Sequence, residues 1–259
     1  MKKLQALLLT SCVSLIGYSQ QPLDSLFVSN DSLLVQQDSL VIKNRGFTSK
    51  QLILPASLIA GGFLLRNSST NARINRDIKE FRDDNFSAFR TNVDDYFQYS
   101  TILLTFGGNA MGFKSKNNYK QMISDGIVSN ILLSAIVLPL KNNIGDMRPD
   151  GSASNSFPSG HTTAAFNCAT LHFLEYRDDN VLFASAGFGI ASTTALFRVL
   201  NNRHWLSDVT AAAGIGIATA VVVHYFNPFR FESKKETSLT LLPTYSQNTA
   251  GFVLNYRFK

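Results

Sequence analysis

The chain is 259 residues long and carries 24 Lys and Arg residues against 18 Asp and Glu, for a net charge of +6. This excess suits an anionic substrate or an anionic membrane surface. The two cysteines, Cys12 and Cys168, exclude a disulfide framework, and the sequence holds no Gly-rich nucleotide loop, cysteine cluster or nucleic-acid motif. We therefore expect neither a cofactor nor a nucleic-acid partner.

Residues 1–19 have the pattern of a secretory signal, with a basic start at Lys2 and Lys3 and a short apolar core over 4–16. Residues 9–12 faintly resemble a lipoprotein cleavage site, and an uncleaved signal anchor is a third interpretation. Each of the three would carry the chain that follows out of the cytoplasm.

Residues 20–50 form a polar linker in which Asp-Ser-Leu recurs every seven residues, beginning at Asp24, Asp31 and Asp38. A heptad with a single apolar position makes a poor core. We expect a linker or a segment that lies on a surface, and the repeat itself indicates no function.

The region 51–230 is predicted to be an all-α helical bundle of five to six apolar helices, embedded in a membrane. The mean hydropathy of +0.03 is low for such a protein, although the polar tails dilute it. Only the last two apolar segments are long enough to span a bilayer comfortably, and their Gly and Ala content suits close helix packing. Residues 71–92 look amphipathic. The apolar segments are 52–65, 98–113, 126–140, 162–176, 181–200 and 207–226.

The tail, residues 231–259, differs from the apolar segments before it, because its pattern favours β-strands. Two β-rich runs, 237–244 and 251–258, are joined by a turn-like stretch, which predicts a short β-hairpin. One hairpin cannot form a barrel alone, so we expect a small appendage.

The first of three polar motifs follows the apolar segment that ends at residue 140. Gly145 and Pro149 end any helix there, so Lys141 and Arg148 are expected at or just beyond its tip. Arg presents a planar fork to phosphate oxygens and Lys a point charge. Basic residues also flank apolar helices simply to reach the membrane surface, and this motif alone favours that interpretation.

The second motif has the features of a helix start. Pro158 suits the first turn, Ser159 is a good N-cap, and Gly160 allows close backbone approach. Free N–H groups at such a start bind anions. His161 would then lie beside a bound anion, where it could donate a proton.

The third motif contains Arg198, His204 and Asp208. Spacing of four places the His204 and Asp208 side chains on one face of a helix, where the carboxylate can fix the imidazole tautomer and leave the other ring nitrogen free to attack. Residues 201–202 are expected to break the helix, so that Arg198 closes one helix and His204 opens the next.

Together the motifs predict a phosphate-binding site. A zinc site built from His161, His204 and Asp208 is the alternative, but the neighbouring cations would repel a metal and attract an anion. We therefore expect no metal.

The pattern resembles the type 2 phosphatidic acid phosphatase and vanadium haloperoxidase superfamily, whose signature is K-x6-R-P, then P-S-G-H, then S-R-x5-H-x3-D. The resemblance covers roughly residues 95 to 226. Phe197 departs from it, because it stands where the family has Ser, which removes one hydroxyl near the phosphate site.

The resemblance implies a role for each matching residue. His204 would be the nucleophile that forms a phosphohistidine, Asp208 would orient it, and His161 would be the general acid. The remaining motif residues would hold the phosphate oxygens: Lys141, Arg148, Ser159, Gly160 and Arg198.

The implied activity is a phosphatase acting on a lipid-like substrate: lipid A, phosphatidic acid, phosphatidylglycerol phosphate or undecaprenyl pyrophosphate. The alternatives are a soluble periplasmic acid phosphatase, a non-catalytic anion- or lipid-binding protein, and a vanadate-dependent haloperoxidase.

The side of the membrane that the site faces depends on how many segments before it span the membrane. We expect that segment 52–65 does not span the membrane, so that the site faces the periplasm from the bacterial inner membrane; if the segment spans, the site faces the cytoplasm. A periplasmic or outer-membrane location remains the alternative.

Overall fold

A computed structural model describes residues 46–67, 69–231, 239–246 and 249–256. The predicted signal at 1–19 and nearly all of the predicted linker at 20–50 lie outside these residues.

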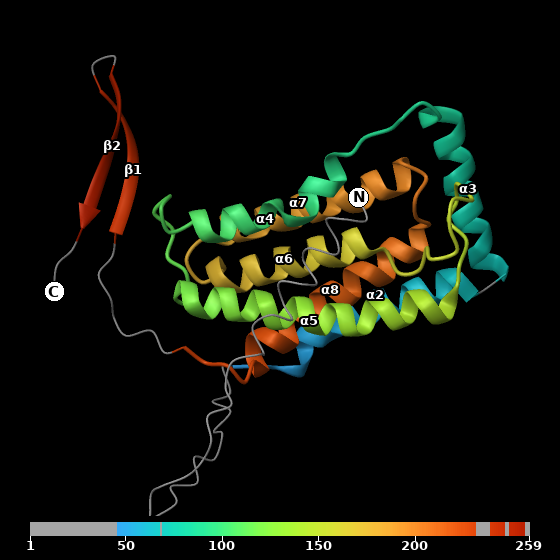
Figure 1. Cartoon of the computed structure of the whole chain (residues 1–259), viewed down its shortest axis with the longest axis horizontal. Coiled ribbons are helices and arrows are strands. Elements are labelled where there is room, and N and C mark those ends of the chain that lie inside the picture. The colour runs from blue at the N-terminus through green and yellow to red at the C-terminus, as the bar shows by residue number, and fades with distance from the viewer. Residues whose placement is uncertain (1–45, 68, 232–238, 247–248, 257–259) are drawn as a thin grey trace, which may run out of the picture. The chain divides into compact units, whose positions relative to one another are not determined.

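All six apolar segments are helical, and the described part contains seven α-helices after a short 3-10 turn (Figure 1). The prediction of an all-α bundle over this region is confirmed. In chain order the elements are η1 (Ser49–Leu52), α2 (Ile53–Asn67), α3 (Ser69–Phe86), α4 (Val93–Gly107), α5 (Tyr119–Ile144), α6 (Gly160–Tyr176), α7 (Val181–Leu200) and α8 (Leu206–Phe226).

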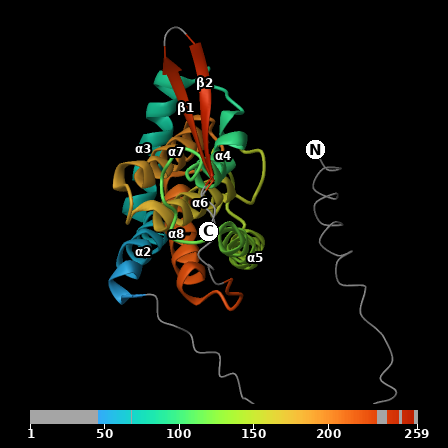
Figure 2. The ribbon, with the colours of Figure 1, turned by 90° about the vertical axis from the view of Figure 1, so that its left-hand side faces the viewer.

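Helix α8 is the centre of the bundle and packs against α2, α5 and α6. Figure 2 looks along the bundle and shows α6 and α8 among the other helices. Close approach depends on two glycines of α8: a Cβ at Gly214 would lie 2.6 Å from the Pro55 carbonyl oxygen of α2, and one at Gly216 would lie 2.4 Å from that of Thr163 in α6. Small residues therefore let two helices contact α8 at backbone distance.

The segment formed by η1 and α2 runs along α8. Gln51 donates to the Tyr225 hydroxyl (3.0 Å) near the end of α8, and Gly62 faces Ala211 closer to its start. The stretch from Gln51 to Gly62 therefore extends along α8 from near its end towards its start. The expectation of a site that faces the periplasm assumes that segment 52–65 does not span the membrane, so the position of α2 beside α8 matters for it.

Two helices begin earlier than predicted. Helix α4 covers 93–107 rather than 98–113, because Asp94 and Asp95 fit its first turn, where the helix dipole favours carboxylates. Helix α5 covers 119–144 rather than 126–140, because the Asn118 side chain accepts a hydrogen bond from the Gln121 amide and caps it. Apolar runs alone mark the core of a helix better than its polar ends.

Three described helices, α5, α7 and α8, are long and apolar enough to cross a membrane. Helix α8 is mostly buried within the protein, whereas α5 and α7 expose most of their apolar surface. Large apolar side chains exposed on these two helices include Ile123, Ile127, Ile131, Leu138, Leu182 and Leu196. Such faces suit contact with lipid.

Beyond the bundle, β1 (Leu239–Ser246) and β2 (Thr249–Tyr256) pair in an antiparallel register from Leu239↔Tyr256 to Ser246↔Thr249.

Candidate active site

The three motifs meet at one end of the bundle, where α5 and α7 end and where α6 and α8 begin. Lys141 lies in the last turn of α5, which Gly145 ends in a left-handed conformation with φ of 68°. Ser159 caps α6, as predicted. The Ser159 amide donates to the Asp208 carbonyl (3.3 Å), which joins the second motif to the third.

Asn155 accepts hydrogen bonds from both cations of the first motif. The sequence did not predict this role, because Asn155 lies between the first and second motifs. The Lys141 ammonium donates to its backbone carbonyl (2.9 Å), and the Arg148 Nε donates to its side-chain oxygen (3.1 Å). Gly160 lies close by, because a Cβ built there would be 3.8 Å from Cε of Lys141. Lys141, Arg148 and the start of α6 therefore lie close together at this end of the bundle.

His204 does not open a helix, contrary to the prediction. It lies in the connection between α7 and α8, and α8 begins at Leu206. Asp208 accepts from the Trp205 amide (2.9 Å) and so belongs to the cap of α8. The predicted pairing nevertheless forms, with His204 Nδ1 3.3 Å from Asp208 Oδ2. The two side chains therefore meet at the N-terminal cap of α8 and not along one face of a helix.

A third partner of this pair is Ser156. Its hydroxyl donates to Asp208 Oδ2 and lies 3.5 Å from His204 Nδ1. Three donors therefore converge on one carboxylate oxygen, and they leave Nε2 as the unengaged nitrogen of the imidazole. Nothing in the spacing of the motifs signalled Ser156.

Burial determines the protonation of His204. Its side chain is 2% exposed, and desolvation lowers its pKa to about 4, although the hydrogen bond with Asp208 opposes the shift. The imidazole is therefore neutral at pH 7 and can act as a nucleophile. Burial also lowers the pKa of Arg148, with repulsion from Arg198 contributing, but a guanidinium stays charged.

Arg198 is held from α4. Its Nη1 donates to Asp94 Oδ2 (2.6 Å), and both side chains are buried. Asn201, just after α7, donates to Asp94 Oδ1 (3.2 Å) and to the Thr91 carbonyl (2.9 Å). The end of α7 is therefore fixed against the start of α4, a contact that the spacing within the third motif could not reveal.

His161 is also held from α4, because its Nε2 lies 2.7 Å from Asp95 Oδ1. Burial lowers the pKa of His161, and Arg198 lowers it further, while Asp95 and Asp94 raise it. The zinc alternative required His161 to join His204 and Asp208. Among the described residues these three do not form a metal-ligand group.

Phe197, the residue that departs from the family pattern, packs with its ring 5.7 Å from that of Phe89 and 6.4 Å from that of Phe97. An aromatic contact between α7 and the segment around α4 therefore stands where the family has a serine hydroxyl.

The other two histidines lie away from the motifs. His172 bridges helices, with Nδ1 3.2 Å from the Thr105 hydroxyl and Nε2 3.0 Å from the Phe183 carbonyl. His224 is buried near the far end of α8, with Nδ1 3.9 Å from carboxylate oxygens of Asp125 and Glu175.

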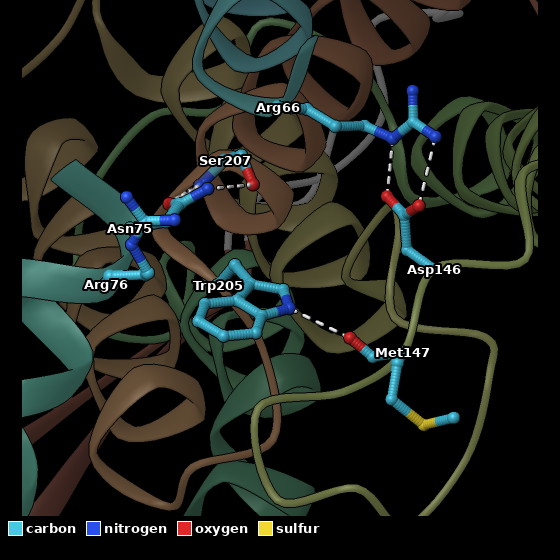
Figure 3. Close-up of a pocket in the computed structure, with 7 residues that line it drawn as sticks. All are labelled: Arg66, Asn75, Arg76, Asp146, Met147, Trp205 and Ser207. Carbon is cyan, nitrogen blue, oxygen red and sulfur yellow. Dashed lines mark hydrogen bonds and ion pairs between the residues drawn. The ribbon is translucent and has the colours of Figure 1, made fainter. Parts of the chain in front are cut away.

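A pocket of about 310 Å³ adjoins the site on the side of α2 and α3 (Figure 3). Arg66 binds Asp146 through two nitrogens, and the Trp205 indole donates to the Met147 carbonyl (2.9 Å). The first contact joins α2 to the first motif, and the second joins the third motif to the first. The motif cations and His161 are not part of its lining.

Residues 122–232 match the PAP2 superfamily, and they contain all three motifs. The chain belongs to the PAP2 superfamily, and with its apolar helices it is a membrane protein of that class.

Over 176 residues the chain is 35% identical to the lipid A 1-phosphatase of Porphyromonas gingivalis, a match that covers 67% of this chain. The chain spans only 38% of the length of that relative.

Two solved structures are also similar. LpxE of Aquifex aeolicus has 22% identity and a TM-score of 0.44, covering 57% of this chain and 94% of that one. A phosphatidylglycerolphosphate phosphatase of Bacillus subtilis has 17% identity and a TM-score of 0.48, covering 69% and 99%.

Proposed function

We propose that the protein is a metal-independent phosphatase that hydrolyses a phosphomonoester or pyrophosphate of a lipid-like substrate through a phosphohistidine. The observation that carries the proposal is the buried, neutral His204, whose Nδ1 is held by Asp208. A protein that only bound phosphate would need the cations and not this pair.

Positioning and charge neutralisation dominate phosphoryl transfer. Lys141, Arg148 and Arg198 bind the phosphate oxygens, together with Ser159 and the Gly160 amide. Nε2 of His204 attacks phosphorus as the bond to the leaving oxygen breaks. His161 gives its proton to that oxygen, then takes a proton from the water that cleaves the phosphorus–nitrogen bond.

A lipid substrate is supported by two features. The candidate site lies at one end of α5 and α7, whose length and apolar faces suit a bilayer. The similar protein from Porphyromonas gingivalis is named for action on lipid A, which makes a phosphate of lipid A the first candidate. Phosphatidic acid, phosphatidylglycerol phosphate and undecaprenyl pyrophosphate are the other candidates.

We propose further that the site faces the periplasm from the inner membrane. The signal-like start of the sequence supports this, and so does the length of α2, whose 15 residues extend about 22 Å and fall short of a bilayer core of about 30 Å. If α2 crosses with α8, an exported N-terminal segment would instead place the site in the cytoplasm.

The decisive experiment measures phosphate release from a panel of these four lipids by purified protein in detergent, with His204→Ala as the control. Turnover of at least one lipid by the wild type, absent from the variant, is expected. Activity confined to small water-soluble esters would favour an acid phosphatase. Absence of any release, with retained binding of phosphate, would overturn the proposal.

A further inference from the structure

We propose that Asp95 is a positioning residue for the general acid, forming with His161 a second aspartate–histidine pair in addition to that of His204 and Asp208. This inference rests on the phosphatase activity proposed above and adds a residue to its machinery. Asp95 belongs to α4, which lies outside the segment 122–232 that matches the superfamily.

The geometry begins with two adjacent acids in the first turn of α4. Neighbouring helical residues point in different directions, so the two carboxylates serve different partners. Asp94 is 1% exposed and binds Arg198. The Asp95 side chain is 52% exposed and binds His161, whose side chain is 28% exposed. One helix turn therefore holds both a phosphate-binding cation and the candidate acid.

The contact determines which nitrogen can act. A carboxylate only accepts hydrogen bonds, so the His161 Nε2 that lies 2.7 Å from Asp95 carries hydrogen. The proton for the leaving oxygen then comes from Nδ1. In the first step Nδ1–H protonates the leaving alkoxide as its bond to phosphorus breaks. In the second step Nδ1 accepts a proton from the attacking water.

The charges around His161 make such a partner necessary. Arg198, from α7, disfavours its protonated form, and so does burial, whereas Asp94 and Asp95 on α4 favour it. A general acid must carry its proton near the working pH. Asp95 makes the direct contact among these groups and therefore does most to oppose the lowering of the His161 pKa.

The test compares Asp95→Asn with wild type on two substrates that differ in the leaving group. On an alkyl phosphate we expect a loss of about tenfold or more, because the alkoxide must be protonated. On p-nitrophenyl phosphate we expect little change. The alkaline limb of the pH–rate profile should move to lower pH, and Asp95→Glu should restore part of the activity.

A double-mutant cycle separates positioning from a general structural effect. In the His161→Ala background, Asp95→Asn should cause no further loss. Asp84→Asn, an exposed carboxylate on α3, is the matched control and should behave as wild type. Equal losses on both substrates, or full additivity with His161→Ala, would overturn the role of Asp95. The phosphatase proposal would survive that result as long as wild type is active and His204→Ala is not.

Discussion

Asp208 contacts His204 from the cap of α8, with Oδ2 3.3 Å from Nδ1, and the same oxygen accepts from the Trp205 amide. The carboxylate that orients the imidazole is therefore also the group that starts the helix. One carboxylate therefore joins the start of α8 to the candidate nucleophile.

Replacement of the nucleophile should abolish turnover. His204→Ala removes the imidazole that Asp208 holds, and with it the nitrogen proposed to take the phosphoryl group. We expect phosphate release to fall to background in detergent, with phosphate binding retained. The control is His172→Ala assayed at matched folded concentration, since His172 lies away from the motifs. Near wild-type activity in His204→Ala would exclude the phosphohistidine mechanism.

The acidic limb of the pH profile should report His204. Its pKa is depressed to about 4, so the reactive neutral form is complete at pH 6 and is lost as pH falls through 4. Contact with Asp208 raises this pKa, so Asp208→Asn should move the limb to still lower pH while reducing the maximal rate. Using the same substrate for both proteins cancels the titration of the substrate. A limb that moves upward in the variant would contradict this assignment.

Chelation should leave activity intact, because cations of the protein neutralise the phosphate. Vanadate should inhibit competitively, because it mimics the five-coordinate transition state in the same pocket. Assays with and without EDTA, and with increasing vanadate, measure both effects. Complete loss in EDTA with rescue by Zn²⁺ or Mg²⁺ would favour metal chemistry. A vanadate and peroxide halogenation assay checks the haloperoxidase alternative.

Cysteine labelling should reveal the orientation of the site. Single cysteines at Ser152 and Asn202, in a Cys-free background, lie at the motif end of the bundle, whereas one at Lys116 lies between α4 and α5 at the opposite end. We expect an impermeant thiol reagent applied outside the inner membrane to label the first two and not the third. The reverse pattern would place the site in the cytoplasm. Labelling of only one of the first two would contradict a shared site, and release by osmotic shock would favour a soluble protein.

Packing around α8 should be intolerant of added volume. The Cβ of Gly216→Ala would lie 2.4 Å from the Thr163 carbonyl oxygen, so α6 must shift, at a cost of about 1–3 kcal/mol. Thermal unfolding in detergent should show a lower midpoint. Gly189→Ala in α7 meets nothing within 4 Å and is the matched control, for which we expect an unchanged or higher midpoint. Equal midpoints for both variants would show that α6 adjusts freely.

The sequence by itself determined which segments are helical and three of the helix ends near the site. Gly145 ends α5, Ser159 caps α6 and Asn201 follows the last turn of α7, because each signal acts within a few residues of chain. The same local spacing placed Lys141, Arg148, His161 and His204 at one end of the bundle.

Only the tertiary structure decided which groups hold these residues in place. Ser156, Asn155, Asp94 and Asp95 carry no motif, and their hydrogen bonds to site residues span up to 104 positions of sequence. The same holds for α2, whose length alone predicted little about its run along α8. Long-range contacts depend on how the helices pack against one another. The spacing of residues within a single segment does not determine that packing.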